Sequence, residues 1–204
     1  MNQGSRGLRA RLRLAVHDTL LEATERAIVE DGVDGASLQS IARRADVAVG
    51  TIYNYFNDRQ ELFRELFMRR RSEVLSAVDA GMKEAADASF EAQLEAFARA
   101  FLAYYDVRRD FMRVVFASET LRLQLMCDKA GRHRPFLAEL ESRAERIMRV
   151  GARERQLQED DVELFASVFT SVLRGVVAQR LDQTAVLADA APRVVDLFCH
   201  GAVR

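Results

Sequence analysis

The sequence predicts an all-helical protein, and three observations carry that prediction. Proline occurs only twice in 204 residues, at Pro135 and Pro192, whereas the helix-favouring residues Ala, Arg, Leu and Glu are abundant. Apolar residues recur three and four positions apart along most of the chain, as they do on one face of a helix. No segment alternates apolar and polar residues over the length of a strand. Because 49% of the residues are hydrophobic, the chain can bury a sizeable core.

The N-terminal part predicts a small helical head behind a basic arm. Residues 1–13 carry four arginines and no acidic residue, a composition typical both of an arm lying along phosphates and of a solubilising tail. Residues 14–31 form the first expected helix, and Gly32 ends it because glycine readily takes the left-handed conformation that closes helices. Ser37 is expected to cap a second, short helix.

The second helix and a third, over residues 49–56, are separated by a tight turn, which is the spacing of a helix-turn-helix. Such a motif sets its second helix in the major groove of DNA. The apolar residues expected to hold the motif together are Ile41, Ala42, Val47, Ile52 and Phe56. The alternative is an ordinary three-helix packing unit, with Tyr53 and Tyr55 as core aromatics. Because positions 53 and 55 cannot share one helical face, this alternative does not explain both tyrosines.

Beyond the head, the pattern predicts a long connecting helix and a larger helical body. Asp58 and Glu61 have the spacing of a capping box, and the helix that they open is expected to run to about residue 80. Eleven of the sixteen aromatic residues lie beyond residue 89, so the larger core belongs to the body. Further helices are expected over residues 90–106, 109–127, 135–156, 160–182 and 189–202.

The head segment carries the pattern Gly32-x-x-x-x-Ser37-Leu-x-x-Ile-Ala followed by Val47-x-x-Gly-Thr-Ile-Tyr-x-Tyr-Phe-x-x-Arg-x-x-Leu62. This pattern resembles the DNA-binding head of the TetR family of bacterial transcriptional regulators. The resemblance implies a three-helix DNA-binding head over residues 1–57, joined by a long helix to a ligand-binding and dimerisation bundle over residues 58–204. It also implies a cytoplasmic, ligand-responsive repressor that binds a palindromic DNA operator as a homodimer.

Carried over position by position, the DNA contacts of the family fall on nine residues of the head. Ser37 and Gln39 open the second helix, whose N-terminus attracts phosphate. Arg59 places a cation at the start of the connecting helix. The remaining six lie in or beside the recognition helix: Val49, Gly50, Thr51, Tyr53, Asn54 and Tyr55. Among them Asn54 is the best candidate for a hydrogen bond to a base edge, because Asn pairs naturally with adenine.

Three positions depart from the pattern of the family. Ala48 stands where a serine or threonine usually caps the recognition helix, so a cap contributing about 1 kcal/mol is missing. Asp46 takes the place of the usual turn glycine, and short polar residues tolerate the left-handed region best after glycine. Val49 offers a base only apolar contact.

The aromatic and methionine residues of the body are candidates for an effector cavity or for an ordinary core. The resemblance implies a small, largely apolar effector held among them. The candidate cavity residues are Phe97, Phe101, Tyr104, Tyr105, Phe116, Met126, Met148, Phe165 and Phe169.

The last two expected helices carry a broad apolar stripe, which fits either a dimer interface or packing within one chain. Two copies related by a two-fold axis would form a four-helix interface. The candidate interface residues are Phe169, Val172, Leu173, Val176, Val194, Leu197 and Phe198. Asp189 is expected to cap the final helix, with Pro192 in its first turn.

Composition and motifs weigh against several other classes of protein. The formal net charge of −1 excludes a wholly basic DNA-coating protein. No apolar run is long enough to cross a membrane. Neither cysteine belongs to a CxxC motif, which favours a reducing compartment. The sequence has no HExxH, GxSxG or glycine-rich phosphate loop, so no enzyme activity, cofactor or metal site is predicted. The remaining alternative is a helical protein-interaction module with weakened DNA binding.

Overall fold

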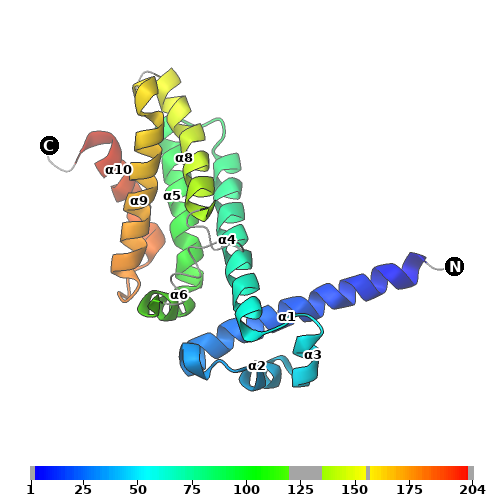
Figure 1. Cartoon of the computed structure of the whole chain (residues 1–204). Coiled ribbons are helices and arrows are strands. Elements are labelled where there is room, and N and C mark those ends of the chain that lie inside the picture. The colour runs from blue at the N-terminus through cyan, green and yellow to red at the C-terminus, as the bar shows by residue number, and fades with distance from the viewer. Residues whose placement is uncertain (1–2, 120–134, 155–156, 202–204) are drawn as a thin grey trace.

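Helices make up all the regular structure of the parts that the computed structural model describes, residues 3–119, 135–154 and 157–201. Three N-terminal helices form a head, and the long helix α4 leads from it into a bundle (Figure 1). The bounds are α1 Gln3–Gly35, α2 Leu38–Ala45, α3 Val49–Tyr53, α4 Arg59–Glu84, α5 Phe90–Val107, α6 Arg109–Ala117, α8 Pro135–Arg153, α9 Val162–Arg180 and α10 Ala191–His200. Short 3₁₀ turns at Glu159–Asp161 and Leu187–Ala190 precede α9 and α10. None of the described helices is long and apolar enough to span a bilayer.

The first helix is longer than the sequence predicts, because it absorbs the basic arm. α1 begins at Gln3, where an arm followed by a helix from residue 14 was expected. The run of Leu, Arg and Ala in this segment favours helix, and nothing in it stops a helix. At Gly32 the backbone leaves the helical region, with φ 73° and ψ 176°. This combination of positive φ and ψ near 180° is essentially restricted to glycine, so Gly32 ends the regular helix as predicted, although outside the left-handed helical region that was expected.

The recognition helix is shorter than predicted. α3 ends at Tyr53, and residues 54–55 form a turn in which the Asn54 amide donates to the Thr51 carbonyl at 3.1 Å. Bonds of this shorter span tighten the chain at helix ends. The turn carries Phe56 into the core of the head, where it is buried, as expected. The expected end of this helix at residue 56 is therefore corrected to Tyr53.

The capping box predicted at the start of α4 is present. The Asp58 Oδ1 atom accepts a hydrogen bond from the Glu61 amide at 2.7 Å. In return, the Glu61 Oε2 atom accepts from the amide of Asn57 at 2.7 Å, one residue before the cap. These two hydrogen bonds hold the first turn of α4 to the preceding residues and so set the direction in which α4 leaves the head.

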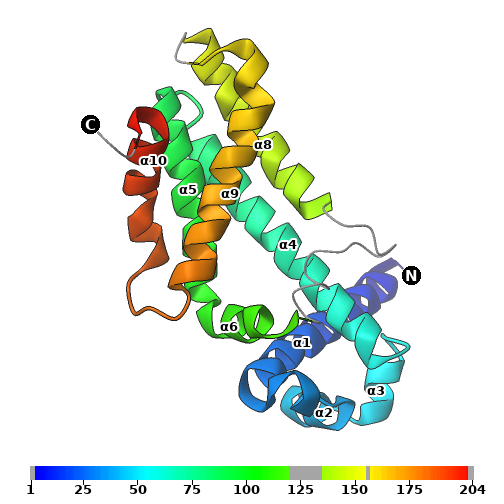
Figure 2. The same ribbon diagram turned by 60° about the vertical axis from the view of Figure 1, so that its left-hand side comes forward.

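The body is organised around α5, which packs against α4, α8, α9 and α10 (Figure 2). Its buried face includes Phe97, whose ring meets Phe169 of α9 edge-on at 5.6 Å. The expected helix 109–127 ends at Ala117, where Ser118 is extended, and its remainder from residue 120 lies outside the described residues. The expected cap at Asp189 is wrong: Ala190 precedes α10 without a side-chain cap, and Asp189 lies in the preceding 3₁₀ turn. Pro192 does lie in the first turn of α10.

Candidate functional site

The helix-turn-helix is closed by two local features that the sequence predicts. The Ser37 side chain accepts a hydrogen bond from the Ser40 amide at 3.1 Å and so caps α2. Asp46 ends α2 in the left-handed conformation, with φ 54° and ψ 47°. Ala48 precedes α3 without a side-chain cap, as the sequence indicates. Of the five expected core residues of the motif, Val47 is half-buried and the other four are buried.

An ion-pair cluster fixes α2 against α1. Arg44 lies 2.7 Å from carboxylate oxygens of both Glu30 and Asp31. The Ser40 hydroxyl donates to the Asp31 Oδ2 atom at 2.5 Å. These hydrogen bonds from Ser40 and Arg44 lower the pKa of Asp31. Arg44 therefore holds α2 against α1, and its guanidinium is already engaged by two carboxylates of α1.

The structure brings most of the predicted DNA contacts to one end of the head. Tyr53 exposes 57% of its surface, while its neighbour Ile52 is buried in the small core. Tyr55 is half-buried and packs near His17 and Phe56. The tyrosines thus point to different environments, as their spacing requires. Gln39, Gly50 and Asn54 are exposed, and Ser37, Val49, Thr51 and Arg59 are half-buried.

Arg59 has a structural role that the sequence does not reveal. Its Nε atom donates to the Ala36 carbonyl at 2.8 Å, and its Nη2 atom donates to the Val33 carbonyl. Its guanidinium also lies over the Phe63 ring, 4.5 Å from the ring centre. Arg59 therefore joins the start of α4 to the last residues of α1 and to the connection between α1 and α2. Its predicted contact with phosphate stays a prediction.

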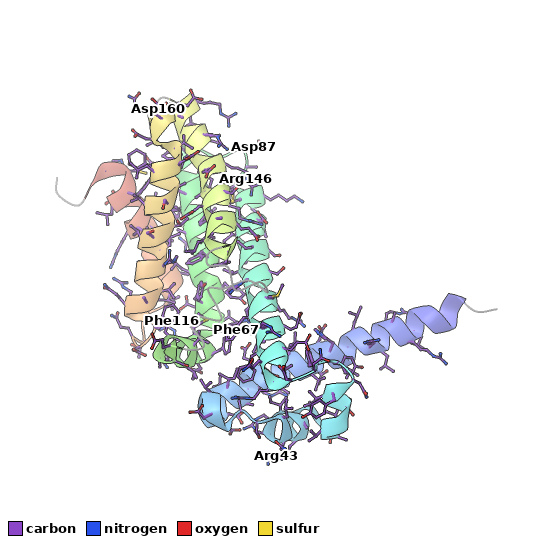
Figure 3. All side chains as sticks on the ribbon, in the orientation of Figure 1. Arg43, Phe67, Asp87, Phe116, Arg146 and Asp160 are labelled. Carbon is purple, nitrogen blue, oxygen red and sulfur yellow. The ribbon has the colours of Figure 1, made fainter. Side chains whose placement is uncertain are left out.

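Two further arginines belong to the head: Arg13 of the predicted basic arm, and Arg43, which the sequence analysis did not select. Arg43 is exposed on α2, on the side of the head away from the body (Figure 3). Arg13 lies over the Tyr55 ring, 5.7 Å from its centre. The adjacent pair Arg43–Arg44 is a visible sequence signal. Only the fold shows that Arg44 is taken up by α1 and that Arg43 faces outward.

The body contains a cavity of about 350 Å³ between α5, α6, α8 and α9. Phe101, Tyr105 and Phe116 from the predicted set line it. Phe97, Phe169 and Met148 instead lie in the solid core, and Met126 lies outside the described residues. Phe165 contacts Phe198 of α10, and Tyr104 faces a charged cluster. The lining residues that the prediction missed are Phe136, Leu137, Ser171, Arg174, Gly175, Val177 and Ala178.

That charged cluster joins the head to the body. The Arg70 Nε atom of α4 donates to Glu25 of α1 at 2.6 Å, and its Nη1 atom donates to Glu73 at 2.7 Å. Arg108, at the start of α6, reaches Glu25 at 2.9 Å, and the Tyr104 hydroxyl donates to Glu73 at 3.0 Å. Burial alone would raise the pKa of Glu73, but the hydrogen bonds and charge of Arg70 lower it overall. The cluster thus links α1, α4, α5 and α6 through charge-assisted hydrogen bonds.

The predicted interface residues divide between the core of one chain and its surface. Phe169, Leu173 and Val194 are buried within the protomer, because α9 and α10 use that part of their apolar stripe against α5 and each other. This corrects their expected place in an interface. Leu197 is exposed, and Val172, Val176 and Phe198 are half-buried. The exposed face of α9 adds Leu164 and Val168, which the sequence analysis did not select.

Comparison with known proteins gives consistent matches. Residues 20–66 match the family model for bacterial regulatory proteins of the tetR family. The HTH-type transcriptional regulator BetI of Cronobacter sakazakii is 29% identical over 160 residues, which are 77% of this chain and 75% of that protein. BetI of Burkholderia thailandensis is 38% identical over 77 residues, or 38% of this chain and 39% of that protein.

Two solved structures share the fold over nearly the whole chain. The fatty acid degradation regulator FadR of Bacillus halodurans has a TM-score of 0.73 at 22% identity, over 92% of this chain and 99% of its own. FadR of Bacillus subtilis, solved in complex with stearoyl-CoA, has a TM-score of 0.73 at 20% identity, over 91% of this chain and 98% of its own.

Proposed function

We propose that this chain is a DNA-binding transcriptional regulator of the TetR family, and that it acts as a dimeric repressor released from a palindromic operator by a small ligand. The observation that carries the proposal is the surface formed by α2 and α3. A capped, ion-paired α2 supports a short α3 whose outer side exposes Gly50, Tyr53 and Asn54. This is the arrangement that a recognition helix needs to reach base edges in the major groove.

The proposed boundary between the DNA-binding head and the regulatory domain lies where α4 begins. We place the DNA-binding head in residues 1–57 and the regulatory and dimerisation domain in residues 58–204. The capping box at Asp58, where α4 begins, supports this boundary, and α4 continues from it into the body. A movement of α4 within the body is therefore transmitted to the head.

Dimerisation is proposed through the outer face of α9 together with α10. Leu164, Val168 and Leu197 are exposed apolar side chains on these helices. Covering such side chains with a second copy removes apolar surface from water, and a two-fold axis makes the same patch serve both chains. Two heads then meet successive major-groove faces about 34–36 Å apart.

The ligand is proposed to enter the cavity between α5, α6, α8 and α9. Stearoyl-CoA in the Bacillus subtilis FadR structure supports an apolar ligand for a protein of this fold. Tyr105 of the cavity wall meets Tyr104 edge-on at 5.7 Å, and Tyr104 bonds to Glu73 in the cluster between head and body. A ligand that binds one arrangement of these helices more tightly than another increases the population of that arrangement. The spacing of the two heads in the dimer changes with it.

Replacing Asn54 with Ala tests the role of α3 most sharply. The variant is expected to lose discrimination at one base pair in each half-site, by about 1–3 kcal/mol. Binding to an operator selected from random DNA, and to its single-base variants, measures this loss. The matched comparison is Arg43→Ala, which should weaken binding to all sequences alike if Arg43 meets phosphate. If the two variants change the same base preferences, or if neither changes any, the assigned orientation of α3 is refuted.

A further inference from the structure

The cavity in the body has an apolar wall with one cation in it. Among the residues that the structure describes, its lining is aromatic and aliphatic except for Ser171, Arg174 and the hydroxyl of Tyr105. None of these described lining residues is acidic. Pockets of this kind hold the apolar part of a ligand by burial and orient it through the few polar groups.

Arg174 is the arginine among the described lining residues, and no hydrogen bond or ion pair joins it to any residue that the structure describes. Arg143, by contrast, pairs with Asp79 at 2.8 Å, and Arg109 pairs with Asp106 at 2.5 Å. Arg174 is half-buried, so its charge is partly removed from water. A partly buried cation without a partner is costly, and an anion that enters the cavity would offset that cost.

Tyr105 and Ser171 are the other polar side chains among the described lining residues of the cavity. Burial raises the pKa of the Tyr105 hydroxyl, and the positive charge of Arg174 acts against that rise. Tyr105 comes from α5 and Arg174 from α9. Ser171, which also lines the cavity, precedes Arg174 by one helical turn. A ligand in the cavity therefore meets these three polar groups in a wall that is otherwise apolar among the described residues.

We propose that the cavity binds a monocarboxylic acid with an apolar tail, whose carboxylate pairs with Arg174 while its tail packs against Phe101, Phe116 and Phe136. This inference rests on the proposed function, since it names the ligand class of the same cavity. The planar fork of an arginine matches a carboxylate with two parallel hydrogen bonds. One cation balances one carboxylate, whereas a phosphate monoester would bring a second charge against the apolar wall.

Calorimetry with dodecanoate, dodecanol and dodecanoyl-CoA tests the proposal on the full-length protein. These probes share a twelve-carbon tail and differ in the head group. Dodecanoate is expected to bind at least about 10-fold more tightly than dodecanol, because only its head group pairs with Arg174. Equal binding of dodecanoate and dodecanol overturns the proposal. Tighter binding of dodecanoyl-CoA than of dodecanoate also overturns it, in favour of a thioester ligand.

Arg174→Met keeps an unbranched, flexible side chain but removes the guanidinium and its charge. Dodecanoate is expected to bind this variant about 10- to 100-fold more weakly, with dodecanol binding unchanged. Arg180→Met is the matched control, because Arg180 lies on the same helix and does not line the cavity. Arg180→Met should bind both probes as the unaltered protein does. An equal loss of dodecanoate binding in both variants refutes the assignment.

Thermal unfolding and sedimentation separate this role from a structural one. Without ligand, Arg174→Met should unfold at the same temperature as the unaltered protein or a higher one, since no pairing is lost. A variant that unfolds earlier or dissociates into monomers would show that Arg174 serves the fold or the interface, and the proposal fails. Ligand binding is measured without DNA, so dodecanoate binding that depends on Arg174 stands even if the protein proves not to bind an operator.

Discussion

Arg70→Ala is expected to lower the free energy of unfolding by about 3–5 kcal/mol, the largest loss of stability that we predict for one polar side chain. The Arg70 side chain exposes only 5% of its surface and bridges Glu25 of α1 to Glu73 of α4. Its removal leaves two carboxylates facing each other with less positive charge between them. Chemical denaturation of the variant and of the unaltered protein measures the difference.

Arg99→Ala is the control for this prediction. Arg99 forms an ion pair with Glu95 at 2.5 Å, but both side chains are well exposed, so the pair should contribute less than about 1 kcal/mol. If the two variants lose similar, small amounts of stability, the cluster between head and body is not a structural joint. Acid should weaken the same joint. Because the pKa of Glu73 is lowered in the folded protein, its contribution is present above the unfolded-state pKa and disappears as the pH falls through the folded-state value.

Val168→Glu is expected to reduce operator affinity by about 100-fold or more by separating the dimer into monomers. Val168 exposes 42% of its surface in the single chain, so the substitution should leave the protomer folded. In a dimer built on α9 it would bury two like charges close to the two-fold axis. A monomer loses the gain that comes from holding two heads at one palindromic site, which amounts to about 10²–10⁴ in affinity.

Sedimentation and operator binding of the same preparation test this expectation together. Val107→Glu is the matched control, because Val107 is 83% exposed at the end of α5, outside α9 and α10. The control should remain a dimer and keep its affinity for the operator. A Val168→Glu protein that stays dimeric, or that is monomeric and binds as tightly as before, contradicts the proposed interface.

Features that depend on a few neighbouring residues could be predicted from the sequence. The caps at Ser37 and Asp58 and the left-handed turn at Asp46 involve side chains and amides within three residues of each other. The absence of a cap at Ala48 is equally local. Such features follow from residue type and spacing alone, and the resemblance to a known family rests on the same short segment.

Features that depend on distant partners could not be predicted. Arg43 and Arg44 are adjacent and identical, and only the approach of α1 decides that Arg44 is paired and Arg43 exposed. The body shows the same limit. Its aromatic content predicts a large core, but whether a phenylalanine lines the cavity or fills the core depends on which helices cross beside it. Phe101 lines the cavity, whereas Phe97, one turn earlier on α5, packs against Phe169.

Binding to DNA from the region upstream of its own gene, measured over a series of salt concentrations, tests the central claim most directly. A scrambled duplex of equal length provides the reference. A regulator of this kind should bind the upstream DNA about 10³-fold or more tightly than the scrambled duplex. Its affinity should also fall steeply with salt, with a slope of about −0.9 for each phosphate neutralised. Equal affinity for the two duplexes together with a flat salt dependence would contradict a DNA-binding regulator and favour the protein-interaction alternative.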